Sequence, residues 1–239
     1  MTKRPARRPD ACDEPAASPD APCRHAAMLA RQLPIPHPIT ILMPPVASHA
    51  QPATHGISSG SVVEWLDDEA SIGDHFAALD RPVRLVISVS TSTAYSLPIA
   101  QMACDPIQDV VPDRFSVETA LTEAISNALI HGNLAMPTFG PATDEAHDSY
   151  VRQIDQRLAT RELAARRLTV GVDWDDDEVL ILVIDSGDGY VPVERAAVPG
   201  RGGGMGFTII RSLTTAFEVR HGGRCLVLHF SRIGATVQS

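Results

Sequence analysis

The sequence lacks the cysteine spacing of a metal or redox site, and it lacks the long apolar segments of a membrane or secreted protein. Its four cysteines lack the spacing of a metal site or a redox pair; they stand at positions 12, 23, 104 and 225. The longest aliphatic run, Val179 to Ile184, is far too short to span a membrane, and no apolar segment follows the N-terminal arginines to form a secretory signal. We therefore expect a soluble, cytoplasmic protein with reduced thiols and no membrane partner.

Basic residues are also in short supply. Aspartate and glutamate outnumber lysine and arginine by 29 to 20, which gives a net charge of −9. A general nucleic-acid surface requires clustered lysine and arginine, so nucleic acid is not an expected partner, although a local basic patch stays open.

The 239 residues are enough for one large domain and a tail. Residues 1–58 are rich in proline and alanine and show no sustained period, so they are predicted to be a mostly disordered tail. Within them, Ile39 to Met43 has an alternative interpretation as an edge strand or a partner-docking segment. Residues 59–239 are expected to form the domain, with a long insertion at 134–168.

Strands and helices are interleaved over this domain. The expected strands are 84–89, 168–174, 179–184, 217–220 and 225–230, with 62–66 as a short strand or a helical turn. The expected helices are 96–104, 113–131, 150–167 and 207–215. The acidic run Asp175 to Asp177 is interpreted as a hairpin turn rather than a metal site, because strands flank it. Since hairpins dominate the second half, we predict a two-layer α/β sandwich with a mixed, mostly antiparallel sheet and helices on one face.

Two polar residues share one face of the helix 113–131. Glu123 and Asn127 are four residues apart, so their side chains stack on an arc separate from the apolar one. A carboxylate and an amide oxygen held side by side suit Mg²⁺, which takes few protein oxygens and prefers phosphates and water. Alternatively, Glu123 accepts or orients the proton of an attacking hydroxyl, and a solvated polar face is the simplest interpretation of the pair alone. His131, at the end of the helix, is interpreted as a cation favoured by the helix dipole.

Asp185 follows the uniformly apolar strand 179–184, which is typical of a buried strand that ends at a pocket rim. A buried carboxylate requires a hydrogen-bond donor, and the exocyclic amine of adenine is one. Gly187 and Gly189 then allow the backbone to approach a flat base or to turn sharply. The alternative is a tight turn in which Asp185 is merely a turn residue.

A further glycine cluster precedes the helix 207–215. Four of the five residues from 200 to 204 are glycine, and bare backbone N–H groups that lead into a helix N-terminus form an anion site. Arg201 adds a cation able to hold phosphate oxygens, and a flexible surface loop is the alternative. The candidate phosphate-binding residues are Arg201, Gly202, Gly203, Gly204, Met205 and Gly206. No P-loop lysine follows, which excludes a P-loop, and the glycines do not follow the first strand of a βαβ unit, which makes a Rossmann fingerprint a poor match. The order of the segments is more specific: a helical asparagine, a strand that ends in Asp-x-Gly-x-Gly, and a glycine loop that opens a helix. That order makes ATP the leading ligand and phosphoryl transfer the leading chemistry.

These three motifs, in this order, resemble those of the Bergerat-type ATPases, which include the ATP domains of gyrase, mismatch-repair proteins and histidine kinases. The segment from Glu123 to His131 is similar to their N box, Asp185 to Gly189 to their first glycine box, and Gly202 to Phe207 to their second. The chain most resembles the anti-sigma-factor serine/threonine kinases of bacterial partner-switching systems, where a glutamate one turn before the metal-binding asparagine is typical. The resemblance covers roughly residues 83–231, and the insertion and the tail depart from it.

The resemblance implies a role for each motif. It places Asn127 on Mg²⁺, Glu123 as the catalytic base or water-orienting carboxylate, Asp185 on adenine and the loop 200–206 over the phosphates of ATP. It also implies phosphorylation of an antagonist protein, binding of a sigma factor and a homodimer.

Other functions compete with this one. A histidine kinase requires a phosphoacceptor histidine before an acidic residue, and none of the nine histidines has that context. A gyrase-like or mismatch-repair-like motor requires transducer and DNA-binding parts for which the chain lacks room. The remaining alternative is a non-catalytic ATP-binding regulatory module that binds a protein partner without phosphoryl transfer.

Overall fold

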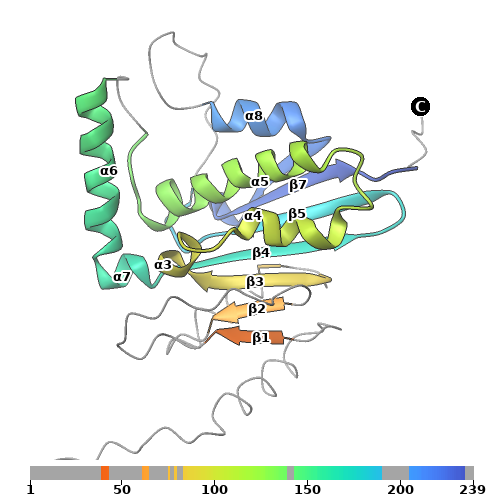
Figure 1. The fold of residues 1–239 in the computed structure, drawn as a ribbon, viewed down its shortest axis with the longest axis horizontal. Coiled ribbons are helices and arrows are strands. Elements are labelled where there is room, and N and C mark those ends of the chain that lie inside the picture. Colours follow the sequence, from red (N-terminus) through yellow and green to blue (C-terminus); the bar gives the residue numbers. More distant parts are fainter. Residues whose placement is uncertain are drawn as a thin grey trace, which may run out of the picture.

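A seven-stranded sheet organises the computed structural model, which describes residues 39–42, 61–64, 75, 78–79, 83–138, 143–189 and 205–234 (Figure 1). The strands lie in the order β1-β2-β3-β4-β5-β7-β6. The pairings of β1 with β2 and of β2 with β3 are parallel, and the other four are antiparallel. The strands are β1 (Ile39–Leu42), β2 (Ser61–Glu64), β3 (Leu85–Ser90), β4 (Arg167–Trp174), β5 (Glu178–Ile184), β6 (Ala216–Arg220) and β7 (Cys225–Ser231). The sheet is thus mixed and mostly antiparallel, as predicted.

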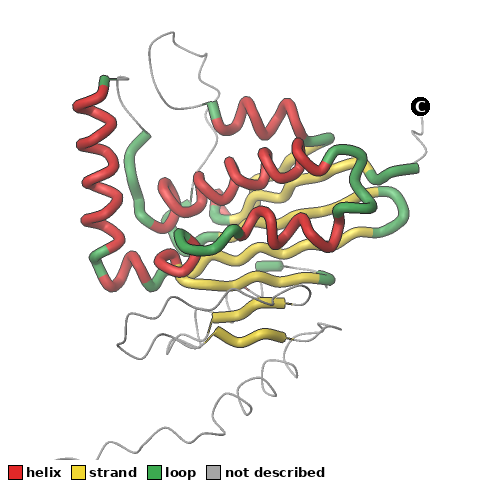
Figure 2. The backbone as a smooth tube through the Cα atoms, viewed as in Figure 1, coloured by secondary structure: helices red, strands yellow, loops and turns green. Residues whose placement is uncertain are grey.

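Helices cover one face of this sheet (Figure 2). They are α3 (Thr91–Ala94), α4 (Ile99–Cys104), the 3-10 turn η1 (Asp105–Ile107), α5 (Arg114–Asn127) and α8 (Gly206–Leu213). Leu121 of α5 and Ile210 of α8 are buried in one hydrophobic cluster with Ile181 of β5. This two-layer α/β sandwich confirms the predicted fold class.

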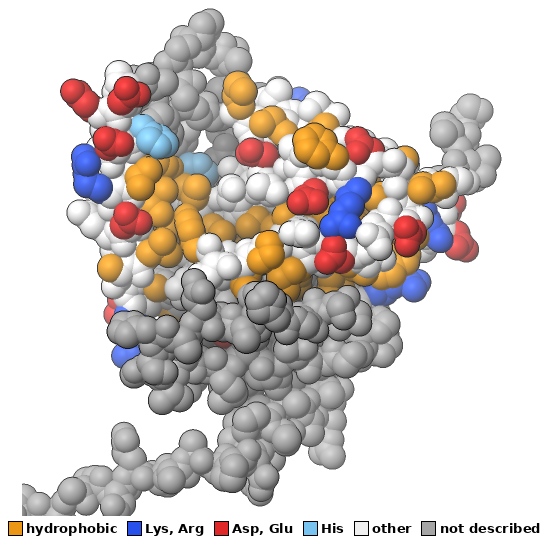
Figure 3. Space-filling view, viewed as in Figure 1, with side chains coloured by type: hydrophobic (Ala, Val, Ile, Leu, Met, Phe, Trp, Pro, Cys, Tyr) orange, Lys and Arg blue, Asp and Glu red, His pale blue; other side chains and the backbone are white. Residues whose placement is uncertain are grey.

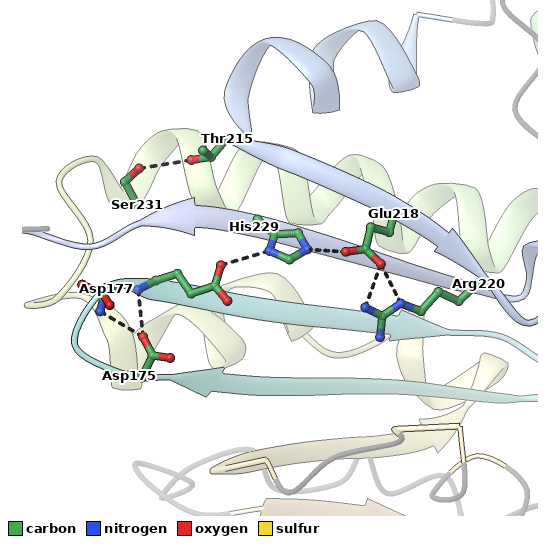
Figure 4. Close-up of polar contacts among 8 residues, drawn as sticks. Asp175, Asp177, Thr215, Glu218, Arg220, His229 and Ser231 are labelled. Atoms are coloured by element: carbon green, nitrogen blue, oxygen red, sulfur yellow. Dashed lines mark hydrogen bonds and ion pairs between the residues drawn. The ribbon is translucent and has the colours of Figure 1, made fainter. Parts of the chain in front are cut away.

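The sheet face opposite the helices carries a smaller apolar cluster and a ladder of charges. Leu79 and Val83 pack on residues of β5 and β7 there. His229 of β7 lies between two carboxylates, 3.1 Å from Glu178 and 3.2 Å from Glu218 (Figure 4). Arg220 pairs with Glu218 at 2.7 Å, so Glu218 contacts both a cation of its own strand and the His229 ring of β7.

The long helix α5 begins at Arg114, one residue after the predicted start. Asp113 is its N-cap, and its carboxylate accepts hydrogen bonds from the backbone N–H groups of Phe115 and Ser116 at 3.0 and 3.3 Å. After Asn127 the chain continues as the π-helical turn η2 (Ala128–Asn133). A π-helical turn inside a helix is uncommon and is frequent at functional sites.

The insertion folds as two helices, α6 (Asp144–Leu158) and α7 (Arg161–Ala164). The predicted helix 150–167 therefore starts six residues too late, because the apolar period begins only at Tyr150. It also runs too far, because α6 ends at Leu158 and Arg167 is the first residue of β4. The observed start has its own signal: Thr143 caps Ala146 N–H at 3.2 Å, and Asp144 and Glu145 fill the first turn. Helix α6 stands beside the end of α5, and hydrophobic side chains gather next to it on the face shown in Figure 3.

Both predicted hairpins are present. Asp175 closes the turn between β4 and β5 by accepting hydrogen bonds from Asp177 N–H at 2.9 Å and Glu178 N–H at 3.0 Å. The turn between β6 and β7 is η3 (His221–Gly223), where Gly222 and Gly223 have φ of 66° and 97°. The acidic run is therefore a structural turn, as interpreted.

The N-terminal segment differs from the expectation of a disordered tail. Ile39 to Leu42 forms the edge strand β1, which pairs with Ser61–Glu64 of β2. The edge-strand alternative for this segment is thus correct, and the sheet begins before residue 59. The other residues of 1–58 lie outside the described part of the chain.

Candidate functional site

Glu123 and Asn127 lie side by side at the start of α8. A Cβ atom built on Gly206 would lie 3.1 Å from both Glu123 Oε2 and Asn127 Nδ2. The two side chains therefore meet the first residue of α8, and a larger residue than glycine would occupy their space. The sequence predicted the pairing of Glu123 with Asn127, and the structure adds Gly206 as their neighbour.

The Asn127 amide is an unpartnered polar group in this site. Its Nδ2 atom is buried and has no hydrogen-bond partner among the residues that the structure describes. A buried amide without a partner costs free energy, so such groups are typically satisfied by a ligand, a water or an ion. The Nδ2 group can donate a hydrogen bond to a phosphate oxygen, whereas the Asn127 Oδ1 atom and the Glu123 carboxylate are oxygens of the kind that Mg²⁺ takes.

Asp185 lies at the end of β5, and the end of η2 packs against it. Its side chain is only 8% exposed, and its carboxylate accepts a hydrogen bond from Gly187 N–H at 2.7 Å. A Cβ on Gly132 would lie 2.5 Å from Asp185 Cγ, and a Cβ on Gly187 would strike the Gly132 backbone. Both glycines are therefore required for this close approach. Gly189, with φ of 90°, approaches the Gly222 carbonyl in the next turn.

Burial raises the pKa of Asp185 from 3.8 to about 6. The Gly187 N–H bond and the charges of Arg224 and Arg166 act in the opposite direction and favour the carboxylate. Asp185 is thus a buried acceptor that is largely ionised at neutral pH, and a hydrogen-bond donor brought by a ligand would stabilise it.

Behind Asp185 lies a buried polar network that the sequence did not reveal. The Asn133 side chain accepts from Ser186 N–H at 2.8 Å and donates to the Arg167 carbonyl at 3.2 Å. His75 contacts the Ser186 hydroxyl at 2.8 Å and the Thr169 hydroxyl at 3.1 Å. Burial, aided by Arg167 and Arg224, lowers the pKa of His75 to about 4, so it is neutral at pH 7. Among these residues, Asn133 lies two positions after the N-box-like segment 123–131, and no motif includes the others.

Arg167 links this network to the N-terminal strands. Its guanidinium is fully buried and donates to the Ser88 carbonyl at 3.2 Å, the Ser88 hydroxyl at 3.0 Å and the Glu64 carbonyl at 3.1 Å. The Glu64 carboxylate accepts from Ser90 N–H at 2.5 Å and from the Thr93 hydroxyl at 2.8 Å. Strand β2 is thereby hydrogen-bonded, through Arg167, to the polar network behind Asp185.

The remaining predicted residues are placed as follows. Met205 is exposed and Gly206 begins α8, whereas Arg201, Gly202, Gly203 and Gly204 lie outside the described residues. The phosphate-binding role of that loop therefore stays a prediction. His131 lies in the last turn of η2, where its Nδ1 donates to the Met136 carbonyl at 2.9 Å.

These features define a class of protein. The Glu123–Asn127 pair at the start of α8 and the buried Asp185 at the end of β5 both suit a nucleotide ligand. The chain belongs to the histidine kinase-like ATPase domain family, whose model matches residues 77–231, well over half of the sequence. ATP is therefore its expected nucleotide. No curated protein matches the chain.

None of the helices among the described residues has the length and hydropathy needed to cross a membrane. Nor does the described part of the chain hold three or more His, Cys, Asp or Glu grouped as a metal site.

Proposed function

We propose that this domain is an ATP-dependent serine/threonine protein kinase of a bacterial partner-switching system. In this proposal it acts as an anti-sigma factor, and it phosphorylates an antagonist protein. The observation that carries the proposal is the meeting of Glu123, Asn127 and Gly206 at one point. The motif resemblance described above supports the choice of this branch within the family.

The adenine end of ATP would bind at Asp185. Its buried carboxylate has an accepting position for the exocyclic amine, and the N–H of Gly187 holds that carboxylate in place. Gly132 and Gly187 lack side chains, which lets the end of η2 pack directly against this carboxylate and fix its position. The arrangement favours adenine over guanine, because guanine presents a carbonyl oxygen in place of that amine.

The phosphate end would lie at the Glu123 and Asn127 side. Asn127 is the residue that would hold Mg²⁺, which neutralises charge on the phosphates when bound. Arg201 and the glycines 202–206 are proposed to cover the phosphates. Met205, which directly precedes Gly206, is exposed at this end of the site.

Glu123 would act on the substrate hydroxyl. In the transfer step the serine or threonine oxygen forms a bond to the γ-phosphorus, and the bridging P–O bond to the β-phosphate breaks, which releases ADP. The hydroxyl proton passes to the Glu123 carboxylate. Phosphoryl transfer depends mainly on positioning and charge stabilisation, so one well-placed carboxylate is sufficient for the proton.

The test is phosphate transfer to a protein. The full chain is incubated with γ-labelled ATP, Mg²⁺ and each candidate antagonist protein from the same genome neighbourhood, and label on serine or threonine is measured. Transfer to one of them supports the kinase. ATP binding without transfer to any of them supports the non-catalytic regulatory module. A sigma factor and a homodimer are further proposals, to be checked by co-purification and by light scattering.

A further inference from the structure

The turn Gly132–Leu134, at the end of η2, is the segment that packs against the buried side chain of Asp185. Gly132 packs directly against the Asp185 carboxylate, so that a Cβ there would lie 2.6 Å from Oδ1. The next residue, Asn133, holds Ser186 N–H, which directly follows Asp185. A displacement of this turn therefore moves the carboxylate that the proposed function assigns to adenine.

Two arginines of the insertion hold this turn from the other side. Arg166 Nη1 donates to the Asn133 carbonyl at 2.8 Å and approaches the Gly132 carbonyl at 3.4 Å. Arg157 Nη1, from α6, donates to the Leu134 carbonyl at 2.7 Å. Carbonyls at a helix end lack part of their intrahelical partners, and charged donors bind them more strongly than neutral ones. The three carbonyls of the turn are thus fixed by side chains outside the core of the fold.

We propose that Arg166, assisted by Arg157, is a positioning residue that seats the turn Gly132–Leu134 against Asp185, so that the insertion 134–168 sets the affinity for adenine nucleotides. This inference rests on the proposed nucleotide site, and it does not depend on phosphate transfer or on a particular protein partner. It gives the insertion, which lies outside the three nucleotide-binding motifs, a role at the base end of the nucleotide.

The test compares substitutions of Arg166 with a control from the same insertion. Arg166→Ala removes the hydrogen bonds and the charge, whereas Arg166→Lys keeps the charge and loses the planar guanidinium that reaches both carbonyls. Arg161→Ala removes an exposed arginine of α7 and is the matched control. Calorimetry measures the Kd of ATP with Mg²⁺ and the Kd of adenosine for the full chain, and thermal unfolding measures stability.

We expect Arg166→Ala to raise the Kd of ATP and of adenosine by the same factor, about tenfold, because the turn acts on the base and not on the phosphates. Where a protein substrate is available, the KM for ATP rises and kcat at saturation stays unchanged. The control Arg161→Ala binds both ligands as the wild type does.

The pH dependence of ATP binding separates the effect of the Arg166 charge on Asp185 from the effect of Arg166 on the position of the turn. Arg166, Arg224 and Gly187 N–H all favour the ionised form of Asp185. Loss of Arg166 raises the pKa of Asp185, so the pH at which ATP binding weakens moves upward in Arg166→Ala. It stays at the wild-type value in Arg166→Lys, which nevertheless binds more weakly than the wild type.

Three results would overturn the proposal. The first is wild-type affinity in Arg166→Ala, and the second is a loss for ATP with none for adenosine. The third combines two observations. Arg166→Ala has a lower Tm, and partial unfolding explains its weaker binding, while the second variant, Arg157→Ala, binds adenosine with wild-type affinity. If the wild type itself binds neither ligand, the nucleotide site and the proposed function fail together, whereas failed phosphate transfer alone leaves this inference standing.

Discussion

Replacement of Asp185 by asparagine tests whether this carboxylate is kept buried for a ligand at the expense of stability. Burial raises the pKa of Asp185 from 3.8 to about 6 in the folded protein. A raised pKa in the folded state gives a stabilising contribution that is fully present below the unfolded pKa and is lost as the pH rises through the folded pKa. The contribution is therefore present below pH 3.8 and lost above about pH 6.

The size of this effect follows from the shift. About two pKa units correspond to roughly 3 kcal/mol of unfolding free energy. Asparagine does not titrate, so the stability of Asp185→Asn relative to the wild type should improve by about this amount between pH 4 and pH 7. A constant cost of the amide, such as an unsatisfied Nδ2, cancels in that comparison.

Urea unfolding of both proteins at intervals from pH 4 to pH 7, without nucleotide, measures the difference. Asp188→Asn, which removes an exposed carboxylate from the same turn, is the control. A stability difference between Asp185→Asn and the wild type that stays constant with pH would refute the assignment of a buried carboxylate with a raised pKa. The same variant should bind ATP more weakly, because an amide oxygen is a poorer acceptor than a carboxylate.

Three further changes probe the fold and the site. Gly132→Ala places a Cβ 2.5 Å from Asp185 Cγ, so we expect about 1–3 kcal/mol lower stability in urea unfolding and a loss of ATP affinity in calorimetry. Removal of residues 1–55 deletes β1 and bares the edge of β2, so the Tm should fall, whereas removal of residues 1–36 keeps β1 and should leave the Tm unchanged. Asp113→Ala removes the N-cap of α5 and should cost about 1 kcal/mol in urea unfolding, with nucleotide affinity retained because the cap lies at the far end of the helix.

Much of the fold was predictable because its signals are local. The expected strands 168–174 and 179–184 differ from β4 and β5 by one residue at the start, since an apolar β-branched run bounded by a turn defines them. The parallel pairing of β1 with β2 was not predictable as a certainty, because it joins residues about 20 positions apart without a turn signal. The start of α6 was missed because it depends on a cap and acidic residues rather than on apolar period.

The candidate site divides in the same way. The neighbouring placement of Glu123 and Asn127 follows from helix geometry alone, and the strand before Asp185 predicts its burial. The contact of Gly132 with Asp185 joins segments 53 residues apart, as does the Asn133 bond to Ser186. His75 reaches Ser186 across 111 residues, and no pattern in the sequence indicates that contact.

The most direct test of the central claim measures phosphate transfer and ATP binding in Glu123→Ala. If Glu123 takes the proton of the attacking hydroxyl, its loss should slow transfer by about 10²–10⁴-fold while the Kd of ATP changes by only a few fold. Glu118→Ala is the control: it removes a carboxylate of α5 whose ion pair with Arg114 is at the surface, and it should transfer at the wild-type rate. Asn127→Ala should lose Mg²⁺-dependent ATP binding as well as transfer. Wild-type transfer by Glu123→Ala would contradict the account.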